Sequence, residues 1–206
     1  LTANDSIITL TGTTGTLFTE TGTFTAGGST VVANPDAAVT LFSGAPTLFN
    51  LSLTPTITAD RTYSVGSALG INGDFEINPT AGSVYNLTVD MGGDITASAT
   101  STTTVTGTTS GISTLDTASG SNYALSTGDL TITSGTFNAN DSNITFTGTS
   151  GTIFTNTGTF NEGTSLVTYS QTTGGTTLTW GAENFYDLAI NMSGQTGSAG
   201  GNIGGG

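Results

Sequence analysis

The 206-residue sequence contains no cysteine, no histidine and no lysine, and Arg61 is its only strongly basic side chain. These absences exclude disulfide bonds, thiolate and imidazole catalysis, Schiff bases and Cys/His zinc sites. Fourteen Asp and Glu residues give a formal net charge of −13, which excludes a basic surface for nucleic acid. No segment approaches the roughly 20 apolar residues of a membrane span, so we expect no membrane insertion.

The missing residue types favour a non-enzymatic protein with no catalytic residue, no cofactor and no metal site. Pairs of carboxylates are the remaining candidates for acid–base work: Asp5 with Asp141, Glu20 with Glu162, and Asp90 with Asp94. The candidates for calcium binding are the turns Asn4-Asp5-Ser6 and Asn140-Asp141-Ser142 and the segment from Asp90 to Asp94. The first pair lies in a repeated Asn-Asp-Ser segment, where Asx side chains commonly cap turns. We therefore expect structural roles for these carboxylates.

The composition predicts a folded all-β chain. Hydrophobic residues make up 34% of the sequence and charged residues only 7%, whereas disordered chains combine low hydropathy with high charge. Apolar and polar residues alternate in short runs, as in Phe49, Leu51 and Leu53 around Asn50 and Ser52. This period of two is typical of a half-buried strand, and β-branched threonine suits the outer positions of such strands.

An internal repeat is the strongest feature of the sequence. Residues 3–33 match residues 139–169 at an offset of 136, with 20 identities in 31 positions and no gap. After one inserted residue, the match continues from 44–53 to 181–190. The substitutions between the copies keep apolar positions apolar and polar positions polar. Both copies are therefore expected to bury the same face.

Two architectures fit such short strands: a β-solenoid (parallel β-helix) and an antiparallel β-sandwich, as in a jelly-roll or immunoglobulin-like pilin. We favour the solenoid, because the chain holds only one and a half copies of the repeat and a solenoid can stop at any coil. We expect a single repetitive β domain over residues 1–206, with coils of about 20 residues and a Gly-rich tail over 195–206.

An aromatic-Asx-Leu strand recurs as Phe49-Asn50-Leu51, Tyr85-Asn86-Leu87 and Tyr186-Asp187-Leu188. Together with Gly22-Thr23-Phe24 and Gly158-Thr159-Phe160, this strand resembles the Thr/Gly/Asn-rich repeats of very large bacterial surface proteins of the adhesin or autotransporter-passenger type. The resemblance implies a β-solenoid, an extracellular or cell-surface location, and a role in a fibre or in adhesion. It implies no catalytic residues.

Six Asn-x-Ser/Thr sequences are possible glycosylation sites in a secreted chain. They are Asn4, Asn50, Asn86, Asn140, Asn143 and Asn191. Asn50 and Asn86 are the best candidates, because alternation turns their side chains away from the core. A chain so rich in threonine and serine contains about this number by chance, so the sequences alone do not indicate glycans.

Threonine rows have both a functional and a structural interpretation. Thr145, Thr147 and Thr149 form one row, and Thr155, Thr157 and Thr159 form another. Such Thr-x-Thr rows resemble the ice-binding faces of some antifreeze proteins, provided that the same pair recurs on adjacent coils of one face. The structural interpretation is that threonine simply suits an exposed strand.

Aromatic residues are a further candidate feature, because they could form a platform for stacking sugars. The candidates are Phe18, Phe24, Phe154, Phe160 and Trp180. Phe18 and Phe24 recur in the second copy of the repeat, and duplicated positions share burial. We therefore favour core packing for these side chains.

These observations favour a non-enzymatic structural subunit of an extracellular filament or fibrous surface layer. The sequence begins at Leu1 without a signal peptide, as a mature product or a fragment would. No capping helix is evident at either end, and uncapped strand edges can pair head to tail with another copy. The expected partner is the chain itself, in a homopolymer, or a longer parent chain. The alternatives are an adhesin stalk or passenger module that binds glycans or a host surface, and an ice-binding protein.

Overall fold

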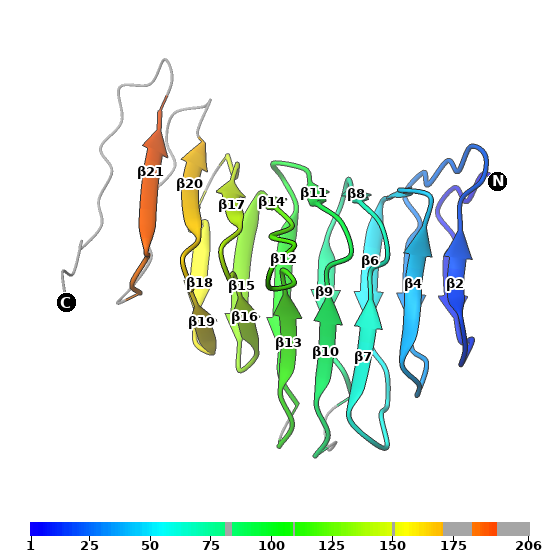
Figure 1. The fold of residues 1–206 in the computed structure, drawn as a ribbon. Helices are drawn as coiled ribbons and strands as arrows, with labels where there is room; N and C mark the ends of the chain where they lie inside the picture. Colours follow the sequence, from blue (N-terminus) through cyan, green and yellow to red (C-terminus); the bar gives the residue numbers. More distant parts are fainter. Residues whose placement is uncertain (81–83, 109, 150, 171–182, 193–206) are drawn as a thin grey trace.

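The computed structural model describes residues 1–80, 84–108, 110–149, 151–170 and 183–192. These residues form 21 β-strands joined by turns, with no helix among them. The chain winds around one axis, and each full winding, or coil, adds strands to three sheets (Figure 1). The expected β-solenoid is confirmed. A sandwich is excluded because the named strands pair in parallel throughout.

Each of the three sheets contains seven strands in coil order. Sheet I consists of β1 (Ile7–Leu10), β3 (Thr30–Ala33), β6 (Asn50–Leu53), β9 (Phe75–Ile77), β12 (Thr102–Thr106), β15 (Asp129–Thr133) and β18 (Phe154–Asn156). Sheet II consists of β2 (Thr16–Thr19), β4 (Val39–Ser43), β7 (Arg61–Ser64), β10 (Leu87–Asp90), β13 (Ser113–Asp116), β16 (Thr136–Asn138) and β19 (Thr159–Asn161). Sheet III consists of β5 (Thr47–Leu48), β8 (Leu69–Ile71), β11 (Ile95–Ala97), β14 (Leu125–Thr127), β17 (Asn143–Phe146), β20 (Leu166–Ser170) and β21 (Asp187–Asn191).

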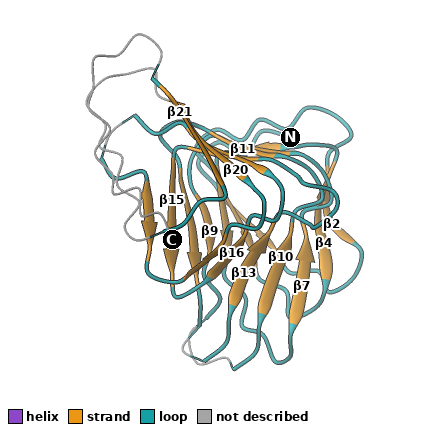
Figure 2. Ribbon diagram, turned by 60° about the vertical axis from the view of Figure 1, so that its left-hand side comes forward, coloured by secondary structure: helices purple, strands orange, loops and turns teal. Residues whose placement is uncertain are grey.

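The coils differ in length, and most exceed the expected 20 residues. The shortest separation between paired residues is 19, from Leu125 to Ile144, and the longest is 30, from Ile95 to Leu125. The strands themselves stay short, so the turns between the sheets take up the variation (Figure 2). Surface turns tolerate added residues at little cost, because loop-closure entropy grows slowly with length.

Apolar side chains stack along the axis inside the solenoid. One column of sheet I runs through five successive coils, and its members are fully or almost fully buried: Ala33, Leu53, Ile77, Val105 and Ile132. The residues between them along each strand point outward, so the alternation in the sequence follows the pleat. The core is thus one continuous apolar column with no break between coils.

The two copies of the sequence repeat lie five coils apart and on different sheets. β1 belongs to sheet I and its counterpart β17 to sheet III; β3 and its counterpart β20 are divided in the same way. Five full coils lead from β1 to β15, which is also in sheet I. The remaining residues of the 136-residue offset pass through β16 in sheet II and reach β17 in sheet III. The local conformation is nevertheless conserved between the copies. Asn4 and Asn140 both have a φ of 52°, and Gly27 and Gly163 have φ values of 59° and 57°.

Candidate interaction surfaces

The carboxylate pairs that the sequence suggested are not brought together. Asp5 precedes β1 in the first coil, whereas Asp141 precedes β17 five coils later. Asp90 lies on the outer face of sheet II, whereas Asp94 lies at the corner that leads into sheet III. Within the described ranges, no cluster of three or more Asp, Glu, His or Cys side chains is placed to hold a metal ion.

Hydrogen bonds give several of these carboxylates a structural role. Glu20 Oε1 accepts from the backbone N–H of Phe24 at 2.9 Å. Asp141 Oδ2 accepts from Asn122 Nδ2 at 2.7 Å. The Glu20 bond closes a turn between residues four positions apart, and the Asp141 bond joins two turns 19 residues apart. At Glu162 the turn is closed by its backbone carbonyl, which accepts from Ser165 N–H at 3.0 Å.

Asx side chains also link each coil to the next. In each case a side-chain oxygen accepts from a backbone N–H one coil further along the chain. Bonds of this kind, at 2.8–2.9 Å, join Asn50 to Asp74, Asp74 to Thr102, Asp60 to Asn86, Asn86 to Ile112, and Asp94 to Ala124. The recurrent aromatic-Asx-Leu strand therefore supplies caps between coils. Its recurrence was the available sequence signal, but the partner of each cap depends on the coil length.

The six glycosylation candidates differ in accessibility. The side chains of Asn4, Asn86, Asn143 and Asn191 are exposed, whereas Asn50 and Asn140 are half-buried. The amide of Asn50 donates to Thr30 Oγ1 at 3.3 Å, and that of Asn140 donates to Asp116 Oδ1 at 2.9 Å. Exposure therefore favours Asn86 over Asn50 as an acceptor, and modification at any of the six stays a prediction.

An Asx ladder crosses the outer face of sheet II. Asn161 Nδ2 donates to Asn138 Oδ1, and Asn138 Nδ2 donates to Asp116 Oδ2, both at 2.8 Å. The ladder continues to Asp90, which pairs with Asp116 in register, so two like charges are stacked there. Burial, and then the Asp116 carboxylate, raises the pKa of Asp90 above its ordinary value. Burial and Asp74 raise the pKa of Asp129 in the same way.

Asp90→Asn is expected to stabilise the fold by about 1 kcal/mol at neutral pH, because it removes one of two stacked charges and supplies a donor for Asp116. In the wild type, the raised pKa means that the folded state favours the protonated form of Asp90, which adds to the free energy of unfolding. This contribution is complete below the ordinary pKa of 3.8. It is lost as the pH rises through the raised pKa of the folded state, because the carboxyl then ionises beside Asp116. The difference in Tm between variant and wild type should therefore shrink as the pH falls from about 7 towards 4.

Asp94→Asn is the matched control for this change. It also removes one negative charge, but its amide oxygen can still accept from Ala124 N–H. If the Tm difference between Asp90→Asn and the wild type grows as the pH falls, the stacked charges of Asp90 and Asp116 do not cause the effect.

The structure separates the two threonine rows. Thr145 lies on β17 in sheet III, whereas Thr155 lies on β18 in sheet I and Thr159 on β19 in sheet II. Other threonines meet the requirement for an ice-binding face, which is that the same Thr-x-Thr pair recurs on adjacent coils of one sheet. Thr104 and Thr106 pair with Thr131 and Thr133, and Thr131 pairs in turn with Thr155.

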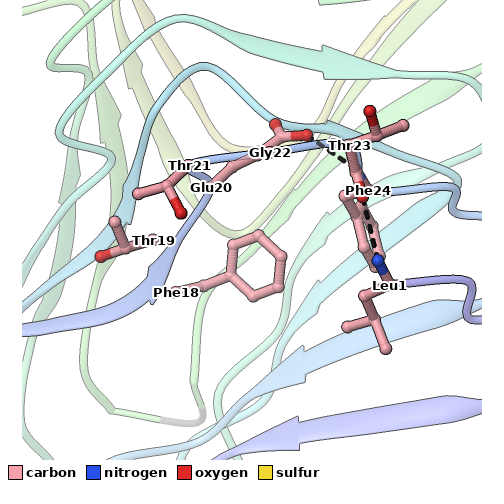
Figure 3. A pocket seen from close by; sticks show the side chains of 8 residues that line it. All are labelled: Leu1, Phe18, Thr19, Glu20, Thr21, Gly22, Thr23 and Phe24. Carbon is pink, nitrogen blue, oxygen red and sulfur yellow. Dashed lines mark hydrogen bonds between the residues drawn. The ribbon is translucent and has the colours of Figure 1, made fainter.

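The aromatic candidates pack in the core at the two ends of the solenoid. Phe154 and Phe160 are buried, with ring centroids 5.5 Å apart. Phe18 and Phe24 make the same edge contact at 5.2 Å but are only half-buried. They line a cavity of about 280 Å³ at the N-terminal end (Figure 3). The fifth aromatic candidate, Trp180, lies outside the described residues.

The sequence matches no family model, and comparisons with curated proteins and with solved structures find no significant match. In the described part of the chain, no helix is long and apolar enough to cross a membrane. The fold itself defines the class: a three-sided β-solenoid built from an internal repeat.

Proposed function

We propose that this chain is a non-enzymatic structural subunit of an extracellular filament or fibrous surface layer. The observation that carries the proposal is the unbroken run of parallel pairing through the seven described strands of each of the three sheets. Parallel ladders place backbone hydrogen bonds along the solenoid axis. Tension along that axis is shared by three sheets at once, which suits a load-bearing element.

The surface supports the same role. Arg61 offers the only trypsin site in the sequence, and it lies in β7 with Nε bonded to Asp36 Oδ1 at 2.9 Å. The hydrogen bonds that the hydroxyl and the backbone N–H of Thr58 donate to the Asp36 carboxylate, and then the contact with Arg61, lower the pKa of Asp36. A basic site held in a strand by a charge-assisted bond resists cleavage until that coil opens. Resistance of this kind favours a chain exposed to proteases outside the cell.

Immunogold labelling of the source cells, with an antibody raised against the purified chain, tests the proposal. Labelled fibres or a labelled surface layer are the expected result. Label confined to the cell interior overturns it. Discrete hits on a glycan array by a monomeric chain would move the assignment to the adhesin-stalk alternative.

Ice binding is a second candidate, and the threonines on the outer face of sheet I favour it. Thr104 and Thr106, then Thr131 and Thr133, repeat the same pair on adjacent coils, and Thr155 extends the array to a third coil. Adjacent parallel strands are about 4.8 Å apart, and alternate residues along a strand are about 7 Å apart. The array is therefore a regular grid of hydroxyl and methyl groups.

Thermal hysteresis of the purified chain decides this second candidate. If the grid binds ice, Thr133→Lys is expected to remove most of the hysteresis, because the long charged side chain holds the face away from the ice surface. Thr62→Lys, at an exposed position on sheet II, should leave hysteresis unchanged. An absence of hysteresis in the wild type at millimolar concentration excludes ice binding.

A further inference from the structure

One coil in the middle of the solenoid turns polar side chains into the core. This coil contains β12, β13 and β14 (Figure 1). Four of its fully buried side chains carry hydroxyl groups: Thr103, Ser113, Thr117 and Thr127. In the coil before it, every buried position of β9, β10 and β11 is apolar. The same holds for β15, β16 and β17 in the coil after it.

The strand register shows which apolar residues these hydroxyl groups stack upon. The pairs are Thr103 with Phe75 and Leu130, Ser113 with Leu87, and Thr127 with Phe146. Val105 and Leu115 keep the apolar cluster continuous through the coil. Burial of apolar surface holds neighbouring coils together, and a hydroxyl-bearing side chain contributes less of it than Phe or Leu. The apolar contact on both sides of this coil is therefore reduced.

Hydrogen bonds satisfy three of the four hydroxyl groups. Thr127 Oγ1 donates to the backbone oxygen of Asp129 at 3.0 Å, and it lies 2.9 Å from Thr103 Oγ1, which therefore donates to it. Thr117 Oγ1 donates to the carbonyl oxygen of Ala139 at 2.9 Å. Such bonds replace bonds to water in the unfolded chain, so their net contribution to stability is small. They compensate only in part for the missing apolar contact.

Ser113 is the exception among the four. Its Oγ is buried and has no hydrogen-bond partner among the described residues. A hydroxyl group that leaves water without gaining a partner lowers the free energy of unfolding. Ser113 is the first residue of β13, so this cost falls where the chain enters sheet II.

The turn after β13 gives the coil room to move. Ile95 and Leu125, which pair across it, are 30 residues apart, the longest separation between paired residues in the described chain. The turn between β13 and β14 takes up part of that length, and its residues 119–122 are exposed. Segments with few buried apolar contacts open at low cost.

We propose that the coil of β12, β13 and β14 is a built-in weak point, at which the solenoid opens before the coils on either side. In a solenoid each coil contacts only its neighbours, so a weak contact can open while the rest stays folded. The inference concerns the folded chain itself and does not depend on the proposed structural role. In a fibre or surface layer, this coil would be the first to yield under load.

Amide hydrogen exchange of the 206-residue chain, followed by mass spectrometry of peptic peptides, tests the weak point. Amides of β12 and β13 are expected to exchange about tenfold faster than those of β9, β10, β15 and β16. Protection of β12 and β13 that equals or exceeds that of these neighbours overturns the proposal.

Two substitutions test whether the buried hydroxyl groups cause the opening. Ser113→Ala removes the hydroxyl group that has no partner. Thr103→Val replaces a hydroxyl with a methyl group of similar shape, while Thr127 keeps its bond to Asp129. Each substitution is expected to slow exchange in β12 and β13 about tenfold, and the double variant should slow it further.

Ser29→Ala is the matched control. Ser29 Oγ is also buried without a described partner, but it precedes β3, three coils before β12. This substitution should leave exchange in β12 and β13 unchanged. If β12 and β13 exchange fast and neither Ser113→Ala nor Thr103→Val slows them, the polar side chains are not the cause and the proposal fails.

Discussion

Gly158→Ala should destabilise the solenoid by about 3 kcal/mol, whereas the same substitution at Gly22 should stabilise it by about 0.5 kcal/mol. Both glycines lie in the same Thr-Gly-Thr-Phe sequence. At Gly158 the new methyl group would lie 2.3 Å from one backbone oxygen and 2.8 Å from Ile132 Cγ2. Backbone cannot yield cheaply, so the two coils must separate locally.

At Gly22 the methyl group enters open space, and the change mainly reduces the freedom of the unfolded chain. Urea unfolding followed by circular dichroism gives both free energies, at a concentration where the chain is monomeric. The opposite signs are the diagnostic result. Equal losses at the two sites would mean that the second copy is not covered as described.

Phe154→Ala should cost about 4 kcal/mol, and its counterpart Phe18→Ala about 2 kcal/mol. Phe154 is 2% exposed and contacts Phe146, Phe160 and Phe185, with ring centroids 5.6, 5.5 and 6.0 Å away. Its truncation leaves a cavity between coils. Phe18 contacts only Phe24 and Phe42 among the aromatic rings of the described chain.

Amide hydrogen exchange shows which coils lose stability in each variant. In a solenoid each coil contacts only its neighbours, so a local defect opens the coils nearest to it first. Phe154→Ala should therefore speed exchange in β15 and β18 more than in β3 and β6. Uniform acceleration along the chain would instead indicate a single cooperative unit.

The internal repeat was sufficient to predict stacked coils of short strands with one inward face. Alternation placed Leu51 and Leu53 inside and Asn50 outside, as observed. The sequence did not predict which sheet each segment joins. Thr145 and Thr155 look equivalent along the chain, yet β17 and β18 lie on different sheets. The reason is that strand pairing is set by coil length, and turns of variable length hide that length.

The caps between coils were hidden for the same reason. The aromatic-Asx-Leu pattern marked Asn50 and Asn86, but only the number of residues in the next coil brings Asp74 and Ile112 above them. Asp60 and Asp94 form the same bond without the aromatic neighbour. A single acidic residue before a strand is too common a pattern to indicate a cap.

The offset between the two copies has a consequence for longer chains. Each further copy of the repeat begins two sheets on from the last, so after three copies every motif has appeared once on each side. A ligand-binding or contact motif carried by the repeat would then be displayed around the whole circumference. Lengthening such a chain by duplication therefore changes the sheet on which a motif lies and the direction in which it faces. Duplication alone would present the same motif on all three sides of the solenoid.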